Sequence, residues 1–171
     1  MELKDSIGLR GHLTVQVLDS DTGKEISKED KPNLICVNSR LAIIRLLAQQ
    51  AAHNTDYYRI WSIYVGDSNT APATNQTDLQ GTNKFGKVVT QDISIIAPDT
   101  SGIMEMEMTL DSGDHNEQWL KECGLFTQGT DSAITVPPNA EARMLARQIH
   151  GEIYKTSGIS VKYTWRYQIT A

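Results

Sequence analysis

Strict alternation of apolar and polar residues over 159–169 is the feature that most constrains this fold. Apolar side chains occupy every odd position: Ile159, Val161, Tyr163, Trp165, Tyr167 and Ile169. This period of two predicts a β-strand with one buried and one solvated face, whereas a helix would spread these aromatic side chains around its circumference. Burying each large apolar side chain contributes about 1.5–3 kcal/mol, so this strand is expected to anchor a sheet.

Earlier segments supply further strands. Alternation, or enrichment in β-branched and aromatic residues, predicts strands at 12–18, 57–65, 88–96, 103–110, 119–126 and 144–149. The turn Asp19–Gly23 returns the chain as a hairpin over 24–26, and residues 27–32 are interpreted as a charged connector. We interpret one face of 103–110 as core: Met104, Met106, Met108 and Leu110. About seven or eight strands predict a mainly β fold, an antiparallel, jelly-roll-like β-sandwich.

One helix is expected near 39–53. Asn38 or Ser39 is a natural N-cap residue. An apolar stripe recurs at helical spacing through Ile44, Leu47, Ala48 and Ala51. The stripe predicts that the helix covers a sheet face or an open end of the β-core.

Composition favours one globular domain. The chain has 171 residues with 39% hydrophobic and 22% charged side chains, and we divide it into an arm over 1–11 and a domain over 12–171. The net charge of −5 argues against nucleic-acid binding, which requires a basic surface. No apolar run approaches the roughly 20 residues of a membrane span. The charged start and only two cysteines, Cys36 and Cys123, predict folding in a reducing cytoplasm.

Two long polar segments, 67–84 and 130–142, are expected to be loops, and long loops often carry function. The glycine and lysine spacing over 81–87 resembles a phosphate-binding loop. That loop requires Ser or Thr next, followed by a helix, but Val88 follows here and opens a predicted strand. The sequence therefore predicts no nucleotide site.

No catalytic or metal-binding constellation stands out. The four histidines are not at metal-ligand spacing: His12, His53, His115 and His150. Four acids qualify as catalytic candidates by residue type alone: Asp92, Glu105, Glu107 and Glu122. Glu122 lies beside the apolar pair Leu125 and Phe126, and we predict that it forms a buried structural ion pair with Arg147. No catalytic residue, cofactor site or metal site is predicted.

Several short motifs occur in a suggestive order. They are Asn33-Leu34-Ile35; Val65-Gly66-Asp67, followed by Pro72 and Thr77-Asp78-Leu79; Lys121-Glu122-Cys123-Gly124-Leu125-Phe126; Met144-Leu145-Ala146-Arg147; and Lys155 before the last strand. Over 33–171 this order resembles small structural proteins of tailed bacteriophages, particularly the β-rich domain of tail-fibre and baseplate-attached proteins. Ser68 and Cys123 depart from the pattern, which has a second glycine and an aliphatic residue there. No repeat shaft follows, so we expect a stand-alone connector.

The resemblance implies a non-enzymatic virion component of the tail, baseplate or neck, a connector or fibre-attachment protein. It would be made in the host cytoplasm and would act as a homo-oligomer with other virion proteins, without nucleic-acid or membrane partners. Residues 1–10 and 67–84 are the interface candidates. Three alternatives remain: a capsid decoration or head-fibre protein, a hydrolase on a jelly roll, and a carbohydrate-binding module. The module would use three tryptophans whose neighbours suggest core positions: Trp61, Trp119 and Trp165.

Overall fold

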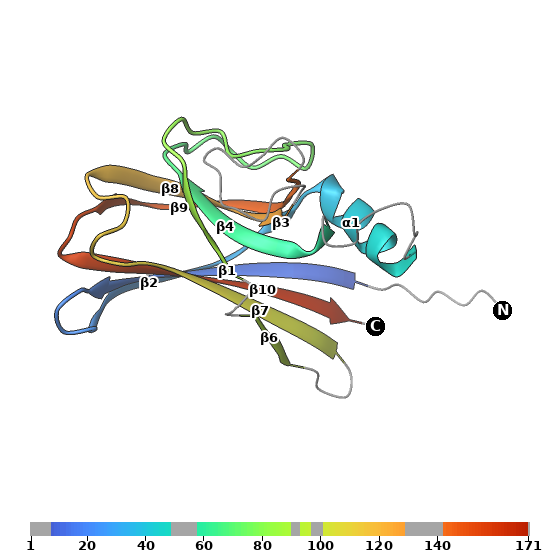
Figure 1. Ribbon diagram of the computed structural model, residues 1–171, viewed down its shortest axis with the longest axis horizontal. Coiled ribbons are helices and arrows are strands. Elements are labelled where there is room, and N and C mark those ends of the chain that lie inside the picture. Colours follow the sequence, from blue (N-terminus) through green and yellow to red (C-terminus); the bar gives the residue numbers. More distant parts are fainter. Residues whose placement is uncertain (1–7, 49–57, 90–92, 97–100, 129–141, 171) are drawn as a thin grey trace.

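Two antiparallel five-stranded sheets stack into a β-sandwich (Figure 1), which confirms the predicted fold class. The computed structural model describes residues 8–48, 58–89, 93–96, 101–128 and 142–170. The first sheet has the order β2 (Glu25–Pro32), β1 (Gly8–Asp19), β10 (Ile159–Thr170), β7 (Ser101–Leu110), β6 (Ile93–Ile96). The second has the order β3 (Leu34–Ile35), β9 (Met144–Lys155), β8 (Gln118–Thr127), β4 (Ile60–Gly66), β5 (Phe85–Val88).

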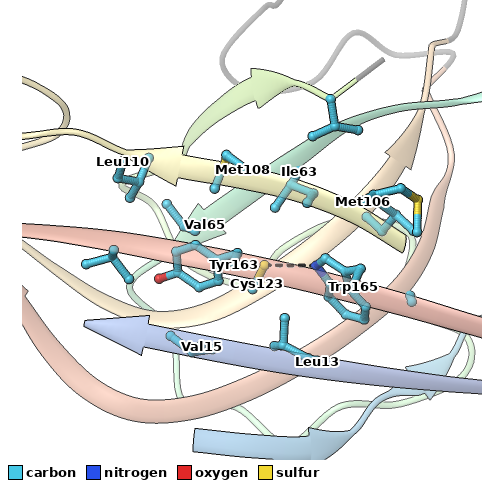
Figure 2. Packing of buried hydrophobic residues seen from close by; sticks show 14 of the residues in the cluster. Leu13, Val15, Ile63, Val65, Met106, Met108, Leu110, Cys123, Tyr163 and Trp165 are labelled. Carbon is cyan, nitrogen blue, oxygen red and sulfur yellow. Dashed lines mark hydrogen bonds between the residues drawn. The ribbon is translucent and has the colours of Figure 1, made fainter. Parts of the chain in front are cut away.

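Strand β10 lies at the centre of the first sheet, paired with β1 on one side and β7 on the other. Its odd-numbered residues from Ile159 to Tyr167 face the core as predicted, and Tyr163 and Trp165 are fully buried. Figure 2 shows these two rings packed among Met106 and Met108 of β7 and residues of the opposite sheet. Trp165 Nε1 donates a hydrogen bond of 3.3 Å to Sγ of Cys123 on β8, which joins the two layers.

The predicted charged connector is wrong, because residues 25–32 form the edge strand β2. Neither face of β2 is buried, so its sequence shows no period-two signal. Its charges instead suit an exposed edge, where they discourage pairing with another chain. Glu29 and Lys31 form one of its ion pairs, with the carboxylate and ammonium 2.5 Å apart.

The predicted single strand over 88–96 is also wrong. Strand β5 pairs with β4 in the second sheet, whereas β6 pairs with β7 in the first. Local β propensity does not specify which sheet a segment joins, and only long-range pairing places these two in opposite layers. Other strands are longer than predicted: β9 continues to Lys155, and β1 begins at Gly8, which pairs with Thr170. Residues 8–11 of the predicted arm therefore belong to the sheet, and residues 1–7 lie outside the described part.

Helix α1 (Val37–Ala48) begins before the predicted N-cap residues, and 49–53 lie outside the described residues. Ser39 is not a cap: its Oγ donates a 2.6 Å hydrogen bond to the carbonyl of Leu145 on β9. Ala42 is buried beside it on the helix, whereas Ile44 of the predicted stripe is 62% exposed. Ser39 and Ala42, and not Ile44, are therefore the packed residues, because their small side chains allow α1 to approach β9 closely. Figure 1 places α1 at one end of the sandwich. No helix in the described ranges is long and apolar enough to cross a membrane.

His150 on β9 is buried between the two sheets in an uncharged hydrogen-bonded state. Its Nδ1 donates to the carbonyl of Gly151 at 2.8 Å, so its Nε2 is the acceptor for the hydroxyl of Tyr163 at 3.3 Å. Burial lowers the pKa of His150 from 6.5 to about 4, although the Gly151 carbonyl and the Glu29 charge oppose this shift. Protonation would leave the Tyr163 hydroxyl proton without its acceptor.

Stability should therefore fall as the pH drops from about 6.5 to 4. The unfolded chain takes up a proton on this histidine near pH 6.5, whereas the folded chain takes it up only near pH 4. The gap between these values corresponds to about 3 kcal/mol of unfolding free energy, present above pH 6.5 and lost on acidification. Urea unfolding at pH 7 and pH 4 should show this loss, and His150→Gln should reduce the difference by a similar amount. The half-buried His12→Gln variant should keep it; an unchanged pH dependence in His150→Gln would refute the assignment.

Candidate functional site

A buried ion pair lies under the long loop 67–84. Glu122 on β8 and Arg147 on β9 have fully buried side chains, and Arg147 Nε donates to Glu122 Oε2 at 2.6 Å. The two residues come from neighbouring strands, where Gly124 is the register partner of Arg147. The predicted structural ion pair is confirmed.

The remaining hydrogen-bonding capacity of this pair is directed at the loop. Glu122 accepts backbone N–H groups from Gln80 at 3.1 Å and from Gly81 at 2.6 Å. Arg147 Nη1 donates to Oε1 of Gln76 at 3.0 Å, while its Nη2 is buried without a partner in the described residues. Burying two charges costs desolvation energy, which such additional hydrogen bonds help to offset. The ion pair is therefore the anchor of the loop.

Glycines allow the loop to approach this anchor. A Cβ atom on Gly66 would lie 2.6 Å from Oε1 of Glu122, and one on Gly81 would lie 2.6 Å from the backbone nitrogen of Asp67. Leu79 is buried over Gly124, where a Cβ would lie 2.8 Å from its Cδ2 atom. Sequence motifs that are far apart along the chain thus lie close together around Glu122.

Asp67 is a second anchor for the same loop. Its Oδ1 accepts the backbone N–H groups of Thr82 at 2.8 Å and Asn83 at 3.2 Å, and its Oδ2 accepts Nδ2 of Asn83 at 3.2 Å. Lys84 closes the loop through an ion pair of 2.6 Å with Asp78. As predicted, 67–84 contains no helix or strand, but its side chains and backbone hold a defined conformation.

The loop joins the exposed side of α1. The backbone N–H of Val37 donates to the carbonyl of Thr74 at 3.0 Å. Beside this contact three apolar side chains of α1 are 44–62% exposed: Val37, Leu41 and Ile44. We call loop 67–80 together with these three residues the loop–helix surface. The sequence predicted the loop as an interface candidate, but it placed Ile44 in the apolar stripe that was expected to pack against the β-core.

The acids nominated by residue type do not converge. Glu105 accepts a 2.6 Å hydrogen bond from Arg166 Nε, and Glu107 lies 2.8 Å from the ammonium of Lys162. These pairs join β7 and β10 on the solvated face of the first sheet, whereas Glu122 is buried under the loop. Asp92 and His53 lie outside the described residues. Within the described ranges, no three His, Cys, Asp or Glu residues form a metal-binding group.

The three tryptophans occupy different environments. Trp165 is buried as predicted, and Trp61 is half-buried with the guanidinium of Arg59 4.6 Å from its ring centroid. The prediction of a core position is wrong for Trp119, which is 46% exposed and pairs with Tyr154, with ring centroids 5.1 Å apart. Trp119 and Leu120 are adjacent in β8, so they face opposite sides of the sheet and only Leu120 is inside.

Sequence reasoning missed a polar hollow beside the loop. Its volume is about 510 Å³, and it is lined by Gly81, Thr82, Asn83, Lys84, His115, Asn116 and Gln118. His115 and Glu117 have positive φ angles of 45° and 61°, which could not be predicted from the sequence. The hollow forms only when two loops far apart in the chain come together.

Comparisons with known proteins gave no relative, since no family model, curated protein or solved structure matches this chain.

Proposed function

We propose that this protein is a non-enzymatic structural component of a tailed-phage virion, a tail, baseplate or neck connector that acts by oligomeric assembly. The motif order in the sequence suggests the class of protein. The observation that carries the assembly role is the anchoring of loop 67–84 by the buried Glu122–Arg147 pair.

Preorganisation is the physical link between this anchor and assembly. Association costs free energy for ordering loops and side chains, and a loop that is already held in place reduces that cost. A loop of this length without secondary structure is uncommon in a compact domain and is usually functional. Its neighbours Val37, Leu41 and Ile44 add exposed apolar area, the usual mark of a contact surface.

The sheet edges favour the loop–helix surface over strand-to-strand pairing. Strand β2 carries a row of charges, and the edge strands β3, β5 and β6 are only two to four residues long. Short and charged edges resist pairing with a neighbouring sheet. Assembly through loop 67–80 and α1 avoids this obstacle.

Leu41→Asp should dissociate the assembly. The charge would be buried against the neighbouring subunit, while in the free chain this side chain is 44% exposed and the fold should lose less than about 1 kcal/mol. Sedimentation of the wild-type protein should give an oligomer, and the variant should sediment as a monomer with a similar melting temperature. Ile26→Asp, at a 59% exposed position on β2, is the matched control and should remain oligomeric.

The place in the particle is tested separately. Immunogold labelling of purified virions should mark the tail, baseplate or neck. Labelling of the head would replace this proposal with a capsid decoration or head-fibre role. A monomeric wild-type protein that is absent from virions would refute the proposal altogether.

A further inference from the structure

The polar hollow lies at the end of the sandwich where the chain crosses between sheets. The connection from β7 to β8 supplies His115 and Asn116, β8 begins at Gln118, and loop 67–84 supplies the opposite wall. The connection from β9 to β10 crosses between the sheets at the same end, because Lys155 pairs with Gln118 in the register of β8 and β9. The hollow is separate from the loop–helix surface.

Both walls are held by internal hydrogen bonds. Asp67 fixes Thr82 and Asn83, as described above. On the other side, Nδ2 of Asn116 donates to the carbonyl of Ser112 at 2.7 Å. The Oδ1 atom of Asn116 accepts from the buried ammonium of Lys155 at 3.0 Å. The hollow therefore keeps its shape without a ligand, as small-molecule sites commonly do.

Backbone strain and an unpaired nitrogen occur together at this hollow. His115 and Glu117 are the non-glycine residues with positive φ in the described ranges. Such conformations cost free energy and often occur at binding sites. The His115 ring stacks on Phe85, with centroids 5.2 Å apart, and its Nε2 atom is buried without a hydrogen-bond partner in the described residues. Burial lowers the pKa of His115, so the imidazole is uncharged at neutral pH.

The groups left for a ligand are uncharged. Lys84 is neutralised by Asp78, and the ammonium of Lys155, which donates to Asn116 and to the carbonyl of Thr156, is not part of the lining. In contrast, the Gln118 side-chain amide makes no hydrogen bond within the described part of the chain. A side-chain amide offers both a donor and an acceptor, which is what hydroxyl groups require. An anionic ligand would need an unpaired cation instead.

From this arrangement we infer that the hollow binds an uncharged, hydroxyl-rich ligand, a saccharide unit, with the Gln118 side-chain amide as its main polar contact and the His115 ring as part of the wall. The volume of about 510 Å³ lies within the usual range for small-ligand sites. The site does not involve the exposed Trp119–Tyr154 pair. It adds a binding role that is independent of the proposed assembly role.

The test is a titration of the ¹⁵N-labelled full chain, followed by amide chemical shifts. The probes are glucose, galactose and N-acetylglucosamine, with sodium acetate as the anionic probe. At least one sugar should cause saturable shifts of the Asn83, Asn116 and Gln118 side-chain amides, and acetate should not. Gln118→Ala should weaken that affinity about tenfold, the loss of roughly one good hydrogen bond. Thr82→Ala should weaken it less.

Gln16→Ala is the control, because Gln16 lies on β1 of the other sheet and bonds to Glu25 at 2.9 Å. Its sugar affinity should equal that of the wild type. Three results would overturn the inference: no sugar-induced shifts, shifts centred on Trp119 and Tyr154, or acetate binding in place of sugar. An unchanged affinity in a folded Gln118→Ala variant would also overturn it.

Discussion

Glu122→Gln should lower the unfolding free energy by about 3–5 kcal/mol, because it leaves the Arg147 guanidinium buried without a counter-charge. For a chain of this size, that loss corresponds to a melting temperature lower by roughly 10 °C. The loop should loosen at the same time, since Glu122 is the acceptor for the amides of Gln80 and Gly81. Chemical denaturation measures the first effect, and faster hydrogen exchange of these two amides measures the second.

The neighbouring ion pair provides a matched control. Lys121 and Glu152 are 2.9 Å apart on the same two strands, but Glu152 is half exposed. Glu152→Gln should cost less than about 1 kcal/mol, as exposed pairs usually do. Combining Glu122→Gln with Arg147→Met should destabilise less than the sum of the single changes, because the unpaired cation is gone. Equal, small losses from Glu122→Gln and Glu152→Gln would refute the anchoring role.

Trp165→Ala should also cost about 3–5 kcal/mol. The change removes a fully buried side chain from the middle of the core and leaves a cavity between the sheets. It also removes the hydrogen bond from Trp165 to the sulfur of Cys123, which joins the two layers. Urea unfolding followed by far-ultraviolet circular dichroism is the direct measurement.

Arg166→Ala tests the opposite face of the same strand. The Arg166 side chain is about half exposed and pairs with Glu105, so its loss should cost less than about 1 kcal/mol. A large loss of stability at position 165 and a small loss at position 166 are expected because alternate side chains of the strand are buried and exposed. Similar losses at both positions would contradict the packing of β10 described here.

Features that depend on local pattern could be predicted well. The buried side of β10 and the methionine row of β7 follow from alternation, which fixes side-chain direction along any strand. The pairing of Glu122 with Arg147 could also be anticipated, because an acid within an apolar segment requires a buried partner. These predictions required residue order alone.

Other features follow from contacts between distant segments. Strand β2 has no buried face and therefore no period, so its pairing with β1 decided its structure. The segments β5 and β6 follow one another closely in the chain but belong to different sheets. Ile44 on α1 fits an apolar stripe, yet Ser39 and Ala42 are the residues that pack against the core.

The sequence by itself determined the class of fold, the inner face of most strands and the position of the long loop, since each is encoded in the period or composition of neighbouring residues. Only the tertiary structure decided which strands share a sheet, that Gly66, Gly81 and Arg147 meet at Glu122, and that His115 and Gln118 face loop 81–84 across a hollow. These contacts join segments that are tens of residues apart. They depend on the free energy of packing the whole chain, which cannot be inferred from a local sequence pattern.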